Sequence, residues 1–366
     1  MKALKIAISH ANAAYMMGGS VVYVWALAKS LRERGHDVRI IAGECDAPER
    51  HFENVPLELF PFRRRERFPK WGTRFRKLME RLSFGWNTRQ YLLEQKCDVL
   101  NIHKPYDLPM AAWVKKRTGC KVVWRCHGRD YFATLQHWLK YADAIYCVSD
   151  FARRDLIEHY PVNAEVIYTG VDTEFFRPAG GSQQTSPPMV LYFGRLEGWK
   201  GVRYLVEAFG QLGDTNFRGR IVGEGPENEN LARMLGELKL GAKVELEPSL
   251  RTREGIRTLV ESADIVVFPP VAVETMSNAM LEAMAMAKAI VATQVGCFVE
   301  VLKQGETAIL VEPRNASALA SGIRALLDAP DRRLSIGKAA RADAVARFDA
   351  QASFDRVEQL FRRICQ

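Results

Sequence analysis

Long apolar runs are absent from this sequence of 366 residues. A helix that crosses a bilayer needs about 20 consecutive apolar residues, and no stretch of the chain supplies them. The apolar block at residues 6–9 is too short for the core of a signal peptide and leads directly into a glycine loop. We therefore expect a first β-strand there and a cytoplasmic protein, with the inner face of the membrane as the alternative location.

Cysteine pairing is absent as well. The seven cysteines include no Cys-x-x-Cys pair, and their odd number does not suit a complete set of disulfides. Disulfide frameworks and structural zinc sites both depend on such pairing and spacing. The sequence therefore predicts free thiols in a reducing compartment and no metal site.

Negative charge is scarcer than positive charge. The chain has 52 lysines and arginines against 43 aspartates and glutamates, and its net charge is +9. Most of this excess lies in residues 62–81, which carry nine cations and two glutamates. The sequence thus indicates a local cationic patch rather than a basic protein. The candidate members of this basic patch are Arg63, Arg64, Arg65, Arg67, Lys70 and Arg74.

Aromatic residues alternate with these cations. They are Phe68, Trp71, Phe75, Phe84 and Trp86. Such a mixture suits shallow insertion at an anionic membrane surface, or docking of a phosphorylated or lipid-linked glycan. The alternative is a solvated cationic helix face whose aromatics turn into the core. Nucleic acid is disfavoured, because the charge is confined to one short segment without a recognisable binding motif.

Short β-branched runs alternate with amphipathic helical stretches along most of the chain, which predicts parallel sheets covered on both faces. The chain is longer than one ordinary core, and the segment RPAGGSQQTSPP interrupts the pattern as a linker does. We therefore predict an α/β protein with two doubly wound domains. The predicted domains are residues 1–176 and 189–345, joined by the linker 177–188. A C-terminal helix is predicted at 346–366, and crossing back to the first domain is one alternative for its position.

In doubly wound sheets, ligands bind beyond the carboxyl ends of the strands. Gly18 and Gly19 follow the first strand and precede a helix, whose amides favour anionic groups. Arg195 and Lys200 follow a later strand, MVLYF, beside Gly194. Arginine grips two oxygens and lysine supplies a point charge, so this pair suits a diphosphate. A plain turn and a pair of solvated surface cations are the respective alternatives.

Two further loops are weaker candidates. Gly223 and Glu224 follow the strand in FRGRIVGEG, where they either approach a nucleotide or form a turn. His127 follows the strand in CKVVWRCHG, and histidine suits proton transfer or switchable hydrogen bonding near neutral pH. His103 is equally well placed by pattern, and a structural role is the alternative for both histidines.

Glu274 and Glu282 lie eight positions apart in VETMSNAMLEAMA. With a helix starting near Thr275, this spacing corresponds to roughly 12 Å along the helix axis and roughly 80° around it. Carboxylates so placed share neither a proton nor a metal ion, which excludes a paired acid and base of the glycosidase type. They suit the two ends of one elongated ligand, with an anion facing the helix start between them. Two glutamates on a helix surface are the alternative.

Taken together and in order, these segments resemble glycosyltransferase family 4, the retaining group with the GT-B fold. The resemblance runs along nearly the whole chain. It implies two Rossmann-like domains that face each other across a cleft. It also implies transfer of a sugar from a nucleoside-diphosphate sugar to a glycan or glycolipid, as in bacterial-type surface polysaccharide or lipopolysaccharide synthesis, without metal or cofactor. The segments that carry the resemblance are GGSVVYVWALAKSLRERGHDVRII, CDVLNIH, VVWRCHGRD, VSDFARRDL, VIYTGVDTEFFRP, YFGRLEGWKGVRYLVEAF, ETMSNAMLEAMA, VGCFVEVL and TAILVEP.

The resemblance assigns roles by position. Arg195 and Lys200 would neutralise the diphosphate. Glu274 would bind hydroxyls of the transferred sugar, Glu282 those of the ribose, and His127 would contact the sugar. The expected mechanism is a front-face displacement in which the departing diphosphate accepts the acceptor's proton. The other implied donor contacts are Gly18, Gly19, Gly194, Gly223, Glu224, Met276, Ser277 and Asn278.

The sequence departs from this family at Cys297 and Ala308, where glycine is usual, and in one turn. Family members have Gly-x-Pro where this chain has Ala287, Lys288 and Ala289, so we expect the turn to be reshaped. A nucleotide-sugar epimerase or a non-transferring binding protein on the same fold is the alternative function. The pairing of GRLEGWKG with two spaced glutamates favours transfer.

Overall fold

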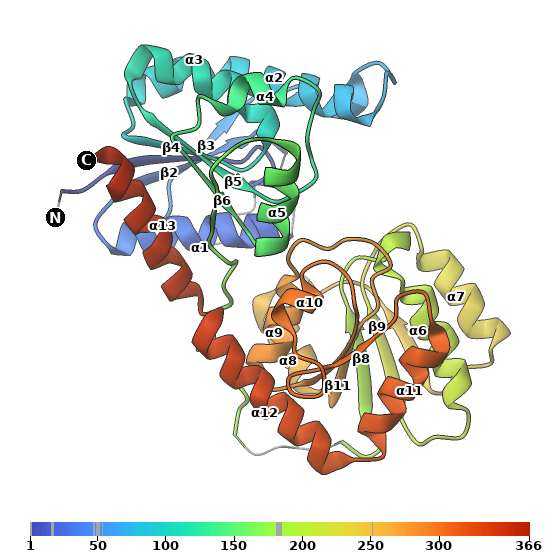
Figure 1. Cartoon of the computed structure of the whole chain (residues 1–366). Coiled ribbons are helices and arrows are strands. Elements are labelled where there is room, and N and C mark those ends of the chain that lie inside the picture. Colours follow the sequence, from blue (N-terminus) through green and yellow to red (C-terminus); the bar gives the residue numbers. More distant parts are fainter. Residues whose placement is uncertain are drawn as a thin grey trace. The chain divides into compact units, whose positions relative to one another are not determined.

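The chain folds into two compact units (Figure 1). The computed structural model describes residues 2–15, 18–46, 48, 52, 54–180, 185–250 and 252–366. The first unit contains Met1–Thr169 and Gln351–Gln366, and the second contains Gly170–Ala350. The chain therefore passes from one unit to the other twice, between residues 169 and 170 and between residues 350 and 351.

The first crossing lies before the segment 177–188 that the sequence indicates as a linker. Val171 already belongs to the second unit, because its N–H donates to the Phe348 carbonyl at 2.8 Å and its carbonyl accepts from Ala350 N–H at 2.9 Å. These bonds join segments far apart in the sequence, which a composition-based boundary does not detect. Residues 181–184 of the expected linker lie outside the described residues.

A parallel sheet forms the centre of the first unit. Its described strands are β1 (Lys5–Ser9), β2 (Asp37–Gly43), β3 (Leu57–Phe60), β4 (Val99–Ile102), β5 (Lys121–Cys126), β6 (Ala144–Cys147) and β7 (Glu165–Val166). Their order in the sheet is β3-β2-β1-β4-β5-β6-β7. The helical elements are α1 (Gly19–Glu33), η1 (Arg65–Arg67), α2 (Thr73–Gln95), η2 (Pro105–Asp107), α3 (Leu108–Thr118), α4 (Leu135–Leu139), α5 (Asp150–His159) and α13 (Ala350–Cys365). Helices α2 and α3 cover one face of this sheet and α1 the other (Figure 1).

The second unit has the same plan. Its described strands are β8 (Met189–Phe193), β9 (Arg218–Val222), β10 (Val244–Glu247), β11 (Ile265–Phe268), β12 (Ala289–Thr293) and β13 (Ile309–Val311), in the order β10-β9-β8-β11-β12-β13. Its helices are η3 (Gly198–Lys200), α6 (Val202–Leu212), α7 (Asn228–Glu237), α8 (Arg253–Glu261), α9 (Asn278–Ala285), α10 (Phe298–Val301), α11 (Ala316–Leu327) and α12 (Pro330–Arg347). Helices α6 and α11 pack together, and α9 packs against α12 (Figure 1).

This architecture confirms the predicted fold class of two doubly wound, parallel-sheet domains. In each sheet the central strands are buried on both faces, so they read as nearly continuous apolar runs. The sequence analysis missed β3, whose residues LELF contain no β-branched side chain and of which only Leu57 is fully buried. An edge strand of this kind lacks the apolar run on which the other strands were recognised.

The C-terminal helix α13 completes the first unit. Its Phe354 ring packs against the Tyr23 ring of α1, with 5.6 Å between ring centroids. Its Glu358 accepts hydrogen bonds from Arg34 at 3.1 Å and contacts His36 at 3.1 Å. Burial opposes ionisation of this carboxyl, but the bonds from His36, Arg362 and Arg34 lower the pKa of Glu358 to about 2. The helix is therefore fixed to the first unit by apolar and charged contacts together.

The turn after α9 places an alanine in a conformation that glycine adopts more readily. Ala287 adopts a left-handed conformation with φ of 55°. Its N–H donates to the Met284 carbonyl at 3.0 Å, and Lys288 N–H donates to the Ala283 carbonyl at 3.0 Å, which is the Schellman ending of a helix. Helix α12 packs against this turn, since a side chain at Gly337 would collide with the Ala287 carbonyl oxygen. The alanine is therefore strained in this turn, and the expected reshaping relative to the family stays a prediction.

The variant Ala287→Gly should therefore be more stable than the natural protein. Relief of a left-handed alanine is worth about 1–2 kcal/mol, of which the greater chain entropy of glycine removes about 0.5–1 kcal/mol. We expect a net gain of about 1 kcal/mol in the free energy of unfolding, measured by urea denaturation. The matched control is Ala342→Gly, in the exposed middle of α12, which should lose about 1 kcal/mol. Equal losses in both variants would contradict strain at Ala287.

Candidate functional site

Four loops meet at one edge of the second sheet. They follow β9, β8, β11 and β12, which are neighbours in the sheet and run in the same direction. Hydrogen bonds join the loops to one another: Leu196 N–H donates to the Glu224 carbonyl at 2.8 Å, and Val271 N–H donates to the Trp199 carbonyl at 2.9 Å. This edge is the carboxyl end of the strands, where such folds bind ligands.

Glycines allow these loops to touch through their backbones. A side chain at Gly223 would collide with the Gly194 carbonyl oxygen, and one at Gly296 would collide with the backbone of Glu274. Gly296 also has a φ of 54°, and the next residue, Cys297, donates its N–H to the Glu274 carbonyl at 2.8 Å. Gly223 was predicted as a donor contact, and the structure gives it a part in loop packing. Gly296 places Glu274, a function that its position after β12 did not reveal.

Lys200 and Glu274 form an ion pair at this edge. The Lys200 Nζ lies 2.6 and 2.8 Å from the two Glu274 carboxylate oxygens. Both side chains are largely buried, with 16% and 11% of their surfaces exposed. Removing one partner from a buried ion pair leaves an uncompensated charge and typically costs about 3–5 kcal/mol. Residues expected to bind two different parts of a ligand thus neutralise each other.

The Arg195 side chain is exposed to solvent and contacts neighbouring residues of its own loop. Its side chain is 64% exposed and forms an ion pair with Glu197, while its guanidinium lies 5.6 Å from the centre of the Trp199 ring. Glu197 also accepts a hydrogen bond from Trp199 Nε1 at 2.5 Å, and the Lys200 Nζ lies 4.4 Å from the same ring. Trp199 therefore stands between the two cations. The sequence analysis overlooked Glu197 and Trp199, although both lie within GRLEGWKG.

Glu282 differs from Glu274 in having no ionic partner. Helix α9 begins at Asn278, and the Ser277 hydroxyl caps it by accepting from Met280 N–H at 3.3 Å. The expected start near Thr275 was wrong, so Glu274 lies in an extended loop and the helical projection does not relate it to Glu282. Among the described residues, Glu282 has no hydrogen-bonding or ion-pair partner for its side chain. Burial raises its pKa to about 7, although Arg253 opposes the shift.

The remaining predicted donor contacts divide between the two units. Gly18 caps α1 and Gly19 is its first residue, so both lie at a helix start in the first unit as expected. In the second unit, Glu224 is exposed, and Met276 comes directly before the Ser277 cap. Among the described residues, no three His, Cys, Asp or Glu side chains gather as metal ligands. The roles of these glycines, of Glu224 and of residues 276–278 as donor contacts remain predictions.

Three histidines line the equivalent edge of the first sheet. His10, His103 and His127 follow β1, β4 and β5, which are adjacent strands. The His103 ring lies 5.5 Å from that of His10 and 5.7 Å from that of His127, measured between centroids. Burial, reinforced by cations such as Arg125 and Lys104, lowers the pKa of His103 and of His127 well below the ordinary value. The sequence analysis placed His103 and His127 at this edge and overlooked His10.

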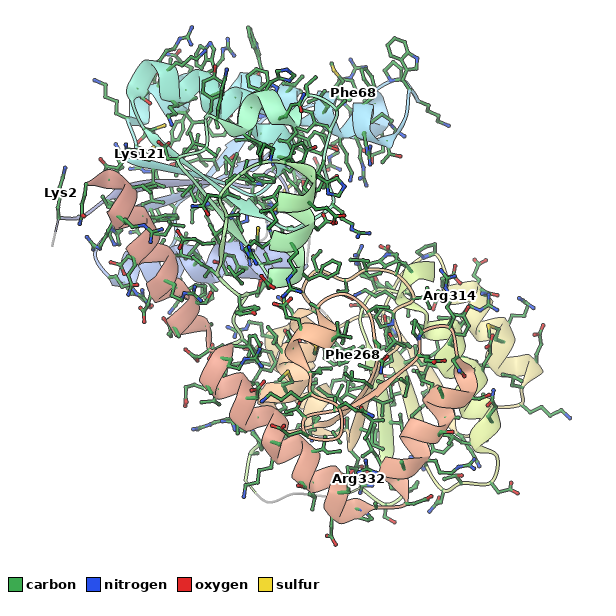
Figure 2. All side chains as sticks on the ribbon, in the orientation of Figure 1. Lys2, Phe68, Lys121, Phe268, Arg314 and Arg332 are labelled. Atoms are coloured by element: carbon green, nitrogen blue, oxygen red, sulfur yellow. The ribbon has the colours of Figure 1, made fainter. Side chains whose placement is uncertain are left out.

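The basic patch lies on η1 and the start of α2. Among the described residues, Arg67, Lys70 and Arg74 have no hydrogen-bonding or ion-pair partners for their charged groups. Its other members have neighbours: Arg63 donates to the Arg67 carbonyl at 2.7 Å, Arg64 lies over the Tyr15 ring, and Arg65 pairs with Glu66 at 3.0 Å. In Figure 2, Phe68 marks the point between η1 and α2, in a part of the first unit that extends away from its sheet.

The aromatic residues near the basic patch do not behave alike. Trp71 and Trp86 are 76% and 66% exposed, whereas Phe84 is buried. The two alternatives of the sequence analysis thus apply to different residues: α2 turns Phe84 to the core and Trp86 to solvent, and Trp71 is exposed just before this helix. No helix in the described part of the chain is both long and apolar enough to cross a membrane.

Two family profiles match the chain. Residues 17–175 match the family described as Glycosyltransferase Family 4, and residues 173–343 match the family described as Glycosyl transferases group 1. Together the two matches span residues 17–343 and include the candidate site loops of both units.

Relatives share about a quarter of their sequence with this chain. The alpha-D-kanosaminyltransferase of Streptomyces kanamyceticus is 27% identical over 246 residues, which cover 63% of this chain and 62% of that protein. The D-inositol 3-phosphate glycosyltransferase of Corynebacterium aurimucosum is 31% identical over 232 residues, covering 57% and 54%. The chain thus spans less than two thirds of these two proteins. The phosphatidyl-myo-inositol mannosyltransferase of Mycobacterium leprae is 27% identical over 370 residues, covering 95% and 93%.

Solved structures share the fold. The sucrose-phosphate synthase of Thermosynechococcus elongatus matches with a TM-score of 0.84 at 19% identity and covers 99% of both chains. The Anabaena HepE protein in complex with UDP-glucose matches with a TM-score of 0.80 at 20% identity, over 98% of this chain and 100% of that one. At such identities the likeness establishes the arrangement of two Rossmann-like domains and nothing finer.

The raised pKa of Glu282 makes stability depend on pH. Its folded pKa of about 7 lies above the ordinary value of 4.5, so its contribution to stability is fully present below pH 4.5 and is lost as pH rises through 7. Glu282→Gln removes this titration. We expect the free energy of unfolding of the variant, relative to that of the natural protein, to rise by about 2–3 kcal/mol from pH 5 to pH 8, measured by urea unfolding at both values. Glu229→Gln, at an exposed position, is the matched control, and a gain independent of pH would contradict the assignment.

Proposed function

The chain belongs to glycosyltransferase family 4, the glycosyl transferases group 1, on the GT-B fold, and from this membership we propose that it transfers a sugar from a nucleoside-diphosphate sugar to a glycan or glycolipid. The transfer proceeds with retention at the anomeric carbon and without a metal ion. Its setting is bacterial-type surface polysaccharide or lipopolysaccharide synthesis, on the cytoplasmic side of the membrane. The resemblance of the sequence segments to this family supports these finer assignments.

The observation that carries the proposal is the Lys200–Glu274 ion pair, which lies among the loops that follow four neighbouring strands of the second sheet. A nucleoside-diphosphate sugar presents sugar hydroxyls, a diphosphate and a ribose diol in that order. Lys200 and the exposed Arg195 offer the cations that a diphosphate requires. Glu274 offers a carboxylate to sugar hydroxyls, and the unpaired Glu282 offers one to the ribose. The second unit thus supplies one matching group for each part of the donor.

Donor binding and the ion pair are chemically linked. Glu274 accepts hydrogen bonds from the Lys200 ammonium. When sugar hydroxyls donate to Glu274, they take over its hydrogen-bonding capacity, and Lys200 becomes available to the diphosphate. As the bond from the anomeric carbon to the diphosphate breaks, negative charge grows on the leaving oxygens beside Lys200 and Arg195. Charges fixed in place before the reaction stabilise that growing charge without reorganisation.

The acceptor's proton has a destination in this scheme. The acceptor oxygen attacks the anomeric carbon from the face that the diphosphate leaves, so the configuration is retained. Its proton passes to an oxygen of the departing diphosphate, and the products are the glycoside and the protonated nucleoside diphosphate. The resemblance gives His127, in the first unit, a contact with the transferred sugar. No side chain is then required as the nucleophile.

Solved relatives and the names of similar enzymes narrow the donor class without fixing the sugar. The Anabaena structure contains UDP-glucose, which supports a nucleotide sugar as donor here. One relative's name describes transfer of a kanosaminyl group, and two others name an inositol phosphate and phosphatidyl-myo-inositol, so the groups transferred and their acceptors differ among the relatives. The epimerase alternative rests on the fold alone and has no support from the charged groups described above.

We also propose that the basic patch brings the protein to an anionic membrane that carries the acceptor. Arg67, Lys70 and Arg74, which have no ion-pair partners among the described residues, are close in the sequence to Trp71, whose ring is exposed. Cations attract anionic headgroups, while an exposed indole favours the headgroup region. A lipid-linked acceptor would then be met at the surface where it resides.

Donor use can be tested with a panel of UDP-, GDP- and ADP-sugars. We expect release of free nucleoside diphosphate from one of them, and loss of kcat by about 10²–10³-fold in Lys200→Met and Glu274→Gln, because each removes a charged contact to the donor. Lys338→Met, at an exposed position of α12, is the control and should retain full activity. Interconversion of sugars without release of nucleoside diphosphate would establish the epimerase instead. Near-normal turnover in Lys200→Met would contradict the diphosphate assignment.

Membrane attachment can be tested by sedimentation with vesicles that contain phosphatidylglycerol. Each cation near an anionic surface contributes about 1 kcal/mol, so neutralising three should weaken partitioning by about two orders of magnitude. The test variant is Arg67→Gln with Lys70→Gln and Arg74→Gln.

Its control changes the net charge equally, by Arg218→Gln, Arg332→Gln and Lys338→Gln at exposed positions of the second unit. We expect the control to sediment like the natural protein. Equal weakening in both triple variants would mean that net charge, and not the basic patch, governs attachment.

A further inference from the structure

The side chains of Asn101, His103 and His127 form a chain of hydrogen bonds in the first unit. His103 Nε2 lies 3.1 Å from Asn101 Oδ1, and His127 Nε2 lies 3.5 Å from His103 Nδ1. Asn101 and His103 are fully buried, whereas His127 is partly exposed. The chain of bonds thus runs from the interior of the sheet to its ligand-facing edge.

The orientation of Asn101 fixes the start of this chain. Its Nδ2 donates to the carbonyl of Val123, its partner in register on β5, at 3.2 Å. A carbonyl oxygen only accepts, so the group facing Val123 must be the amide NH₂ and the group facing His103 must be Oδ1. Asn101 therefore presents an acceptor to His103.

Each following step is determined by the one before. Because Asn101 Oδ1 accepts, His103 Nε2 carries the hydrogen, and in a neutral ring Nδ1 is then the bare nitrogen. Because His103 Nδ1 is bare, His127 donates from Nε2. His127 Nδ1 is left without a hydrogen, and within the described residues it has no hydrogen-bonding partner.

Neutrality of both rings is enforced by their surroundings. Arg125, Lys104 and His10 surround His103 and His127, and Arg125 is buried. Burial, together with these groups, lowers the pKa of both histidines well below the ordinary value. Burial and the cations Arg81, Lys104 and Arg125 also lower the pKa of His10 to about 3. None of these rings is a proton donor of the imidazolium type at neutral pH.

We propose that Asn101 and His103 are positioning residues that hold His127 as the neutral Nε2–H tautomer, so that its bare Nδ1 accepts a hydrogen bond from a hydroxyl of the transferred sugar. The sugar contact rests on the proposed function, whereas the tautomer follows from the first unit alone. His127 then orients the sugar and does not act as a general acid. A histidine of the opposite tautomer would present a hydrogen to the ligand and would repel the same hydroxyl hydrogen.

Nuclear magnetic resonance of histidine labelled with ¹⁵N tests the tautomer directly, since long-range proton–nitrogen spectra distinguish a bare ring nitrogen from a protonated one. The chain contains a reference for each form. His36 Nδ1 accepts from Leu4 N–H at 3.0 Å, so His36 is the Nε2–H form. His159 Nδ1 lies 2.7 Å from the Asp155 carbonyl, so His159 is the Nδ1–H form. The signals of His127 are assigned by their loss in His127→Ala.

In the whole natural protein at neutral pH, we expect His127 to match His36 and to differ from His159. In Asn101→Leu, which removes the first acceptor, the Nδ1–H form of His127 should become populated. Asn101→Asp, which keeps an acceptor facing His103, should retain the Nε2–H form. A natural protein with His127 in the Nδ1–H or imidazolium form would overturn the proposal. An unchanged His127 in a folded Asn101→Leu variant would overturn the role of Asn101.

Measurements of kcat and KM distinguish failure of this proposal from failure of the proposed function. With the donor that releases nucleoside diphosphate, Asn101→Leu should lower kcat about tenfold, the effect of one misdirected hydrogen bond, with a smaller change in the donor KM. Asn101→Asp should recover most of the loss. If the tautomer is as expected but no sugar is transferred, the proposed function fails and the positioning of His127 stands. If the tautomer changes in Asn101→Leu while kcat does not, the sugar contact is wrong.

Discussion

Backbone contact between loops is the constraint on which the candidate site of the second unit depends. Parallel strands end at one edge of the sheet, but side chains brought there would remain far apart if the loops were bulky. Glycine at residues 223 and 296 lets neighbouring loops touch without side chains between them. The approach of the loop after β12 to the backbone of Glu274 then leaves Glu274 within reach of Lys200. The ion pair is thus a consequence of backbone packing.

The two glutamates of the second unit illustrate different ways to keep a carboxylate ready for a ligand. Glu274 remains charged beside Lys200, and the pair avoids the cost of a lone buried charge. Glu282 has no such partner, and burial raises its pKa to about 7 although Arg253 opposes the shift. A ligand hydroxyl that donates to either one competes with a different occupant, an ammonium in the first case and a proton in the second.

The fold was predictable from the sequence because alternating apolar strands and amphipathic helices leave a regular pattern along the chain. Central strands such as β8 and β11 are buried on both faces and stand out as apolar runs, and the loop after β8 carries Arg195 and Lys200. The contacts within the site were not predictable in this way. The start of α9 at Asn278 depends on the capping hydroxyl of Ser277, and the Lys200–Glu274 contact joins residues 74 positions apart. The left-handed Ala287 shows the limit most clearly, since the packing of α12 retains a turn that its own sequence disfavours.

The first unit meets a different electrostatic requirement, and its histidines fit that requirement. In the proposed scheme Glu274 accepts from the sugar as a carboxylate balanced by Lys200, whereas the first unit offers a neutral acceptor, which adds no negative charge beside the phosphates. A neutral imidazole accepts without charge, but only if it stays neutral and its bare nitrogen faces the ligand. Arg125 and Lys104 secure the first condition by disfavouring the imidazolium form of His127. In our proposal Asn101 secures the second through His103, so a buried amide decides which ring nitrogen of His127 faces the sugar.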